Sequence, residues 1–410
     1  MHGMATLTSL VLPMYLPAFL LAIGDGAMNT FLPLYLMRLG TGVAGAALLV
    51  GVGAAGVLVF DLPSGFIVAR YGERRVLTVS GAVMVASSLL IALSPSPAVA
   101  TLGVFLASGA AAFWLVGRLE FMRKALASGS RGRGLSTVGG VMRAGLFLGP
   151  VIGGLVAASA GYRVVFVGTA CLAAVALALF VASPAAQTDP PVARTAAPRL
   201  WDPGALKRVL RSRARVLATA GLSMAILSLA RAGRTLVFPL WGQSIGLGDA
   251  GIGLVVGVSS AADTLMFLPA GLVSDRRGRK WSAVSCLFVL SLGMAMIPLA
   301  RSLGAFIAVG LLVGLGNGMG SGINMTLGAD FAADSEPGVF LGVWRLVTDV
   351  GAGVSPFLVS LVTTALALGP ASLVIAALGL AGGAFHAAVV PETRWGIGAR
   401  RSVRLKPSGP

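Results

Sequence analysis

The sequence contains little charge for its length. Only 11% of its 410 residues are charged, whereas a soluble domain carries about 25%. Hydrophobic residues make up 56% of the chain, and the mean hydropathy is +0.91. A soluble fold has too little interior to hide this much apolar surface, so most of the chain is expected to lie in lipid.

Cysteine is also scarce, and several catalytic sequence patterns are missing. The two cysteines, Cys171 and Cys286, both fall inside apolar runs, so a disulfide framework is not expected. No group of His, Cys, Asp and Glu has the spacing of a metal site, and we expect neither a metal nor a cofactor. The phosphate-binding pattern Gly-x-x-x-x-Gly-Lys-Ser/Thr does not occur, which argues against work driven by ATP. No hydrolase-type nucleophile or clustered catalytic set stands out, so an enzyme is not expected.

The chain contains twelve apolar runs of about 20 residues, the length that a helix needs to cross a bilayer. Hydrophobic residues are continuous rather than alternating within the runs, which favours helices over a β-barrel. The sequence therefore predicts an all-α membrane protein with twelve transmembrane helices. The predicted spans are 10–36, 44–66, 76–93, 99–120, 138–160, 164–183, 216–241, 250–273, 281–300, 304–328, 339–366 and 371–390.

Two segments about half a chain apart have nearly the same sequence. The first is Pro63–Arg75, the second is Pro269–Lys280, and they align at an offset of 206 residues. The same offset aligns Pro33 with Pro239 further upstream. Two copies of one membrane unit are typical of a transporter whose binding site lies between the halves.

One long linker divides the chain into two pseudo-symmetric six-helix bundles, at 1–183 and 216–390. The linker, residues 184–215, holds five prolines and seven basic residues and is unable to span a membrane. Within it, Lys207–Arg215 fit a short basic helix at the membrane interface about as well as a solvated loop. Residues 391–410 form a basic tail. The remaining loops are short, so no catalytic domain outside the membrane is expected.

Basic residues give the chain a net charge of +17, which taken alone would suit a nucleic-acid ligand. Their placement argues otherwise, because 23 of the 31 Lys and Arg fall in five segments on one side of the predicted spans. Those segments are 70–75, 121–137, 184–215, 274–280 and 391–410. Only Arg38, Arg163 and Arg301 lie on the opposite side. By the positive-inside rule we expect a multi-pass protein of an inner or plasma membrane with both termini cytoplasmic, in contact with the lipid bilayer and with no nucleic acid.

Two motifs resemble those of a known transporter family. Gly271–Lys280 matches the signature Gly-x-x-x-Asp-Arg-x-Gly-Arg-Lys of the major facilitator superfamily at every position, and the chain as a whole resembles that family. The first copy departs from the signature, with Ala69 in place of the Asp and Glu73 in place of an Arg. Gly145–Gly154 is similar to the family's antiporter motif Gly-x-x-x-Gly-Pro-x-x-Gly-Gly. That motif accompanies drug–proton exporters, so the resemblance implies this branch.

The loop motifs are interpreted as latches between the halves, with simple orientation by the arginines as the alternative. Gly65 and Gly271 are expected to permit close approach of helices at the turn, and Asp275 can accept hydrogen bonds from a helix N-terminus across the interface. The acidic segment 329–338 is expected to attract the loop of Arg70 and Arg74 when that side closes. The expected latch residues are Gly65, Arg70, Gly72, Arg74, Gly271, Asp275, Arg276, Gly278, Arg279 and Lys280. The antiporter-like residues, expected either to seal one face or only to pack helices, are Gly145, Gly149, Pro150, Gly153 and Gly154.

Ionisable residues inside the spans mark a candidate site, because a charge in hydrocarbon is costly and is usually functional. Asp25 lies near the middle of the first span, with Asn29 one turn further on the same face. The repeat offset aligns Asp25 with Arg231, and Arg234 shares the face of Arg231. We therefore expect an Asp25–Arg231 pair across a central cavity. It would act as a gate, a substrate clamp, a proton switch or a static structural pair.

Further polar residues complete the candidate site. Arg345 and Asp349 are spaced to neutralise each other within one helix. Asn317, Ser321 and Asn324 predict a polar stripe on the tenth span, which either bonds helices or lines a wet cavity. The expected proton-coupling carboxylates are Asp25, Asp263 and Asp349. The expected cavity residues, with Trp114 and Arg118 as an aromatic–cation surface, are Asn29, Trp114, Arg118, Arg231, Arg234, Asn317, Ser321 and Asn324.

Together these observations predict a monomeric secondary transporter that works by alternating access. Its expected partners are a small-molecule substrate and protons. The first hypothesis is proton-coupled efflux of small amphipathic molecules. The alternative is import or symport of a small organic anion, since Arg231 and Arg234 would suit a carboxylate. A membrane-embedded enzyme lacks a clustered catalytic set, and a channel fits the twofold repeat less well.

Overall fold

The computed structural model describes residues 10–126, 128–183, 203–332 and 337–393, and the regular structure in these ranges is helical. Twelve helices within them are long and apolar enough to cross a membrane. The prediction of an all-α membrane protein with twelve spans is therefore confirmed.

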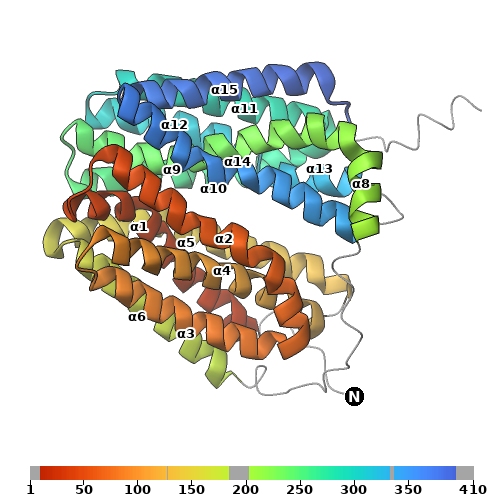
Figure 1. Cartoon of the computed structure of the whole chain (residues 1–410), viewed down its shortest axis with the longest axis horizontal. Helices are drawn as coiled ribbons and strands as arrows, with labels where there is room; N and C mark the ends of the chain where they lie inside the picture. The colour runs from red at the N-terminus through yellow and green to blue at the C-terminus, as the bar shows by residue number, and fades with distance from the viewer. Residues whose placement is uncertain (1–9, 127, 184–202, 333–336, 394–410) are drawn as a thin grey trace, which may run out of the picture.

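The first half consists of six long helices (Figure 1). A π-helical turn, Val11–Tyr15, leads into the first of them. The helices are α1 (Leu16–Arg38), α2 (Val43–Tyr71), α3 (Glu73–Ala92), α4 (Pro97–Ala125), α5 (Ser128–Ala160) and α6 (Tyr162–Ala182).

The second half repeats this arrangement, also starting from a π-helical turn, Leu217–Gly221. Its helices are α9 (Leu222–Ser244), α10 (Asp249–Arg277), α11 (Arg279–Met296), α12 (Leu303–Met319), α13 (Ile323–Phe331), α14 (Pro337–Ala365) and α15 (Leu368–Val389). Figure 1 shows the two halves as separate bundles, with α1–α6 in one and α9–α15 in the other.

The internal repeat is visible in the backbone as well as in the sequence. Gly72 and Gly278, which are 206 residues apart, both have positive φ values, of 83° and 111°, at the turn between two helices. A β-carbon is strained in that conformation, which explains glycine at both sites. Ser96 and Ser302, with the same spacing, both cap a helix N-terminus through their side chains. The repeat therefore specifies the same turns and caps twice.

A short basic helix precedes the second half. This helix, α8, covers Pro203–Val216, so the helical alternative for Lys207–Arg215 is the one observed. It is strongly amphipathic, and it buries Ala205 and Val209 while Arg208, Arg211 and Arg215 are exposed. It packs beside α14 at one end of the molecule (Figure 1).

The two halves meet closely at one end, which we call the sealed end; there α1, α5 and α9 finish and α2, α6 and α10 begin. Gly154 of α5 packs on α10 so closely that a β-carbon there would lie 2.7 Å from the carbonyl oxygen of Asp249. The hydroxyl of Tyr162 on α6 donates to Oδ1 of Asp249 at 2.7 Å. Small residues and a hydrogen bond thus close the interface there.

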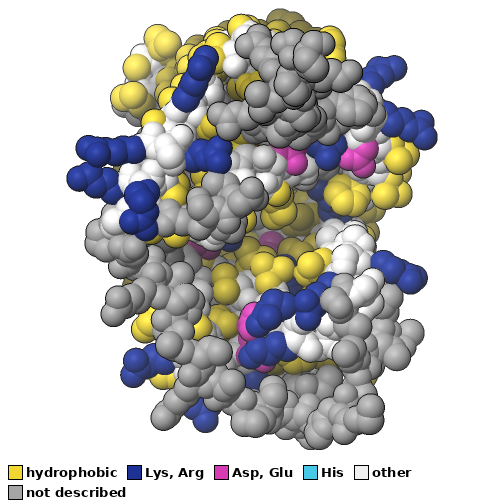
Figure 2. All heavy atoms as spheres, turned by 90° about the vertical axis from the view of Figure 1, so that its right-hand side faces the viewer, with side chains coloured by type: hydrophobic (Ala, Val, Ile, Leu, Met, Phe, Trp, Pro, Cys, Tyr) yellow, Lys and Arg dark blue, Asp and Glu magenta, His cyan; other side chains and the backbone are white. Residues whose placement is uncertain are grey.

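The opposite end, which we call the basic end, contains the C-termini of α2, α4 and α10 together with α8. Figure 2 looks onto it and shows Lys and Arg side chains around its rim, with a hollow between the two halves. The glycines of α5 near this end, Gly139 and Gly140, have open space beside them. The molecule is therefore sealed at one end and open at the other.

The predicted tenth span, 304–328, is broken in the middle, which corrects the prediction of one continuous helix. The first piece, α12, ends at Met319, and α13 begins at Ile323. Gly320 and Gly322 form the turn between them, and Gly322 has a left-handed φ of 76°. Glycine adopts this conformation without strain, and it also has a low helix propensity. The helix therefore breaks where glycines cluster.

Candidate functional site

A polar cavity of about 490 Å³ lies between the two halves. It is formed by α1 and α5 from the first half and by α9 and α10 from the second. Its lining residues are Gly26, Asn29, Thr30, Gly139, Met142, Arg143, Leu146, Pro150, Arg234, Thr235, Phe238, Val256, Ser259, Ser260, Asp263 and Thr264. The cavity therefore combines three charged side chains with apolar walls, at the interface between the repeats.

A hydrogen-bonded chain of charged and amide groups crosses this interface. Nη1 of Arg143 on α5 lies 3.3 Å from Oδ1 of Asp263 on α10. The other oxygen of Asp263 accepts from the amide of Asn317 on α12 at 2.7 Å. Oδ1 of Asn317 in turn accepts from Nε of Arg231 on α9 at 2.8 Å. Arg143 and Asp263 thus hold the first half to the second beside the cavity.

Arg231 caps the broken tenth span and does not pair with Asp25. Its Nη2 donates to the carbonyl oxygen of Gly320 at 3.0 Å and to that of Asn317 at 3.4 Å. The last carbonyls of a helix lack partners within the helix and carry partial negative charge, so a guanidinium stabilises them. The expected Asp25–Arg231 pair is wrong, because the helix break gives Arg231 partners within its own half.

Asp25 lies inside the first half, in a separate pocket of about 200 Å³ formed mainly by α1, α3, α4 and α6. Its electrostatic partner is Arg118 of α4 rather than Arg231. Asn29 lines both this pocket and the central cavity. Asn29 is thus shared by the pocket of Asp25 and the cavity.

Trp114 and Arg118 do not form the expected surface on the central cavity. Trp114 is 5% exposed and packs against Phe180 in the core of the first half, with ring centroids 6.0 Å apart. Arg118 is 6% exposed, and its Nη1 lies 3.1 Å from Sδ of Met142. Their shared helix face points into the bundle, where Arg118 interacts electrostatically with Asp25.

Arg234 reaches the cavity one turn beyond Arg231. Its Nη1 is buried and has no hydrogen-bond partner among the described residues. The hydroxyl of Ser259, which lines the same cavity, is also buried without a partner in the described part of the chain. Both are buried donors in the cavity wall that have no partner among the described residues.

A second ion pair between the halves involves a residue that the sequence reasoning missed. Nη2 of Arg345 on α14 lies 2.8 Å from Oδ1 of Asp61 on α2. Its Nε lies 3.4 Å from Oδ2 of Asp349, the expected partner within the helix. Arg345 is therefore shared between the halves and is not neutralised only within its own helix. Asp61 is the single charged residue of the predicted span 44–66, and this signal could have identified it.

The predicted stripe of Asn317, Ser321 and Asn324 does not exist as one helix face, because the chain turns between α12 and α13. Asn317 bonds Arg231 and Asp263, and Oγ of Ser321 accepts from Nη2 of Arg143 at 3.1 Å. Asn324 instead accepts from Nε1 of Trp344 at 2.9 Å. Because of the break, Asn317 and Ser321 join the hydrogen bonds between the two halves, while Asn324 contacts α14.

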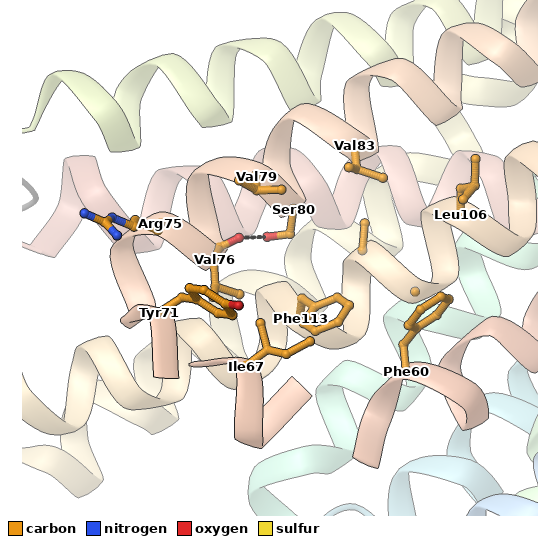
Figure 3. A pocket seen from close by; sticks show the side chains of 12 residues that line it. Phe60, Ile67, Tyr71, Arg75, Val76, Val79, Ser80, Val83, Leu106 and Phe113 are labelled. Atoms are coloured by element: carbon orange, nitrogen blue, oxygen red, sulfur yellow. Dashed lines mark hydrogen bonds between the residues drawn. The ribbon is translucent and has the colours of Figure 1, made fainter. Parts of the chain in front are cut away.

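An apolar groove of about 470 Å³ lies between α2, α3 and α4 (Figure 3). Phe60, Ile67 and Phe113 form its floor, and Val79 at its side is 62% exposed. The Ser80 hydroxyl donates to the Val76 carbonyl at 2.7 Å, so it is satisfied within α3. The groove therefore opens outward, where the spans face lipid, and it lacks the polar contacts of the central cavity.

Comparison with known proteins identifies the architecture. The family model described as Major Facilitator Superfamily matches residues 14–235 and 220–408. The chain belongs to the major facilitator superfamily. It is a multi-pass membrane transporter and not an enzyme. Within the described ranges no group of three or more His, Cys, Asp or Glu side chains could hold a metal ion.

Two solved structures have the same fold. One is a POT family transporter in complex with a thioalcohol-conjugated peptide, with a TM-score of 0.77 and 12% identity over 92% of this chain and 94% of that chain. The other is a POT family transporter in complex with 5-aminolevulinic acid, with a TM-score of 0.76, 12% identity and the same coverage. None of the curated proteins matches the chain. The expected likeness to the drug–proton antiporter branch stays a prediction.

The second copy of the superfamily's loop motif is held within its own half. Nη1 of Arg279 lies 2.7 Å from Oδ1 of Asp275, and its Nε lies 3.5 Å from Oδ2 of Asp330. The carboxylate of Glu392 accepts from the backbone N–H groups of Arg279 and Lys280 at 2.8 and 3.1 Å, which caps α11. With the basic end open, Asp275 makes its ion pair inside the second half and not across the interface.

The first copy of the motif contains the same ion pair with its charges exchanged. Glu73 and Lys124 correspond to Arg279 and Asp330 at the offset of 206 residues. Nζ of Lys124 lies 2.7 Å from Oε2 of Glu73. The departure of Glu73 from the family signature is thus compensated on α4. The expected attraction of the acidic segment to the Arg70 loop stays a prediction; Asp334 and Glu336 of that segment lie outside the described residues.

The antiporter-like glycines of the superfamily motif line two faces of α5. Gly145, Gly149 and Gly153 face α1, and a β-carbon at Gly153 would lie 2.9 Å from that of Ala27. Gly154 faces α10 on the other side. Small residues therefore bring α5 close to a helix of its own half and to one of the opposite half, at the sealed end.

Proposed function

We propose that this chain is a secondary active transporter that works by alternating access, with the central cavity as its substrate site. The observation that carries the proposal is a charged cavity between two repeat-related halves, sealed toward one end and open toward the other. Substrate sites of such transporters lie at the repeat interface, and the halves rock around them. The positive-inside rule makes the basic end cytoplasmic, so the structure corresponds to an inward-facing state.

We propose that protons drive the cycle through Asp25. Asp61, Asp263 and Asp349 are each held in an arginine ion pair. Asp25 interacts electrostatically with Arg118 but forms no ion pair with a described residue. A carboxyl group without a direct ion-pair partner changes its protonation more readily than one that is held by a guanidinium. Asn29 connects its pocket with the substrate cavity, which supports coupling between the two sites.

We propose efflux of small amphipathic molecules as the direction of transport. The cavity supports this substrate class, because apolar side chains such as Leu146, Phe238 and Val256 share its wall with the charged groups. The glycine seam of α5, similar to the antiporter motif, supports exchange with protons. Import of a small organic anion is the second candidate, and the unpartnered Nη1 of Arg234 is the observation that favours it.

Transport in proteoliposomes tests the proposal. The purified protein would be reconstituted, a pH gradient imposed, and the movement of cationic, neutral and anionic dyes followed with and without a protonophore. We expect dye movement against its gradient that the protonophore abolishes. Dye movement that does not depend on the pH gradient would contradict proton coupling. Transport only in the import direction would favour the second candidate, import of an organic anion.

A further inference from the structure

The charges around the central cavity do not balance among the described residues. Three guanidinium groups, those of Arg143, Arg231 and Arg234, surround one carboxylate, that of Asp263. Asp263 is already engaged by Arg143 and by the amide of Asn317. An unpaired charge in a membrane-embedded site is costly, and arginines inside transmembrane bundles normally find a partner. The site therefore lacks negative charge.

Among the described residues, Arg234 interacts electrostatically with Asp263 but forms no hydrogen bond or ion pair. Arg143 donates hydrogen bonds to Asp263 and Ser321, and Arg231 donates to the carbonyl oxygens at the helix break. Nη1 of Arg234 has no hydrogen-bond partner among the described residues, although it is buried. A buried donor without a partner destabilises the protein, and more so when it is charged. Something that enters the cavity can remove this cost.

We infer that Arg234 binds the carboxylate of a small organic molecule in the central cavity. The planar guanidinium suits a carboxylate, which it can bind through two parallel hydrogen bonds. The unpartnered hydroxyl of Ser259 supplies another donor in the same cavity. A volume of about 490 Å³ leaves room for an organic body against Leu146, Phe238 and Val256. The inference rests on the proposed role of this cavity as the substrate site, and it narrows the amphipathic substrates to anionic ones.

A pair of isosteric probes tests the charge requirement. Binding of 2-naphthoate and of 2-naphthamide to the purified protein would be measured in detergent, without any gradient. The probes have the same shape and differ by one charge. We expect 2-naphthoate to bind at least about tenfold more tightly, as loss of a hydrogen bond to a charged group implies. Equal binding of the two probes would overturn the inference.

Substitutions locate the site. Arg234→Gln is expected to reduce 2-naphthoate affinity to the level of the amide, while 2-naphthamide binding stays the same. Arg301→Gln, which removes an exposed arginine at the sealed end, is the matched control and is expected to leave both affinities unchanged. Unchanged 2-naphthoate affinity in Arg234→Gln would overturn the assignment.

Two further variants keep the inference testable should Arg234→Gln fail to fold. Arg234→Lys keeps the charge but loses the planar fork, and Ser259→Ala removes the other unused donor. Both are expected to weaken 2-naphthoate binding, and wild-type affinity in both would overturn the inference. Binding is measured without a gradient, so it is tested separately from transport. If the protein exports a cationic dye with protons but does not bind 2-naphthoate, the anion site is rejected and the proposed function is retained.

Discussion

At the scale of single residues, two arginines on the same helix have different roles. Arg231 and Arg234 share one face of α9, yet Arg231 satisfies carbonyl oxygens at the end of α12 while Arg234 lines the cavity with a free donor. The difference arises in α12, whose glycines open a turn beside Arg231; a β-carbon on Gly320 would lie 3.0 Å from Nη2 of that arginine. A residue's role here follows from which buried groups remain unsatisfied around it.

Asp25→Asn is expected to abolish gradient-driven transport while substrate binding and substrate exchange persist. The amide keeps the size of the side chain but takes up no proton, so the coupling step is removed and the cavity is not. Measurement requires proteoliposomes with a pH gradient for transport and with equal pH for exchange. Glu120→Gln, at an ion pair on the basic end, is the control and should transport normally. Full proton-driven transport by a folded Asp25→Asn protein would remove Asp25 from the mechanism.

At the scale of helices, one ion pair recurs in both halves although both of its residue types change. Glu73–Lys124 and Arg279–Asp330 occupy equivalent positions with opposite charges, and in each pair one partner is the first residue of a helix. The attraction survives the exchange because it depends on the product of the two charges. The altered first motif is therefore interpreted as a compensated motif and not as a damaged one.

Exchanging the first pair tests this interpretation. Glu73→Arg alone places like charges together and is expected to destabilise the first half, by no more than about 1 kcal/mol, since Lys124 is partly exposed. The double variant Glu73→Arg with Lys124→Asp recreates the arrangement of the second half and is expected to recover the loss. Thermal unfolding of both single variants and of the double variant gives the coupling free energy between positions 73 and 124. Additive effects would contradict the interpretation.

At the scale of the whole molecule, the halves are joined differently at their two ends. The sealed end is held by close glycine packing and by the bond from Tyr162 to Asp249. Toward the basic end the contacts are ion pairs, Arg143–Asp263 and Arg345–Asp61, beside a hollow. Alternating access requires that one set of contacts form as the other breaks, so both sets must be individually weak.

Removing the hydroxyl at the sealed end is expected to shift the equilibrium between states. Tyr162→Phe loses one hydrogen bond between the halves, worth about 0.5–1.5 kcal/mol, so the fraction with this end open should rise about two- to tenfold. Distances between spin labels on the loops at 39–42 and 245–248 report the shift. Tyr35→Phe is the control, because that hydroxyl bonds Ser94 within the first half. Equal distance distributions for wild type and Tyr162→Phe would contradict the assignment of this bond as part of the seal.

The orientation in the membrane is tested by labelling single cysteines. In a background with Cys171 and Cys286 replaced by Ala, a cysteine at Ser212 on α8 should resist an impermeant thiol reagent in intact cells. A cysteine at Ser302, at the sealed end, should react, because the positive-inside rule puts that end outside. Reaction at position 212 from outside would show that the orientation is the reverse of the one proposed. The structure would then correspond to an outward-facing state.

Sequence reasoning succeeded where the physics is local or compositional. The number of spans follows from hydropathy, and the membrane class follows from the low share of charged residues. It failed where a partner had to be chosen, as with Asp25 and Arg231, and for Arg345 it found Asp349 but missed Asp61. Repeat symmetry aligned Asp25 with Arg231, but equivalent positions in two halves need not touch.

By itself the sequence determined that this chain is a two-fold repeated bundle of twelve spans, because burial of apolar residues in lipid and the spacing of glycine and proline act along the chain. Only the tertiary structure decided which charges meet. The break after Met319 redirects Arg231, the core of the first half encloses Asp25 with Arg118, and Arg345 reaches Asp61 across the interface. Hydrogen bonds and close ion pairs form only when their atoms lie within about 4 Å, so they depend on helix packing that residue spacing along the chain does not specify.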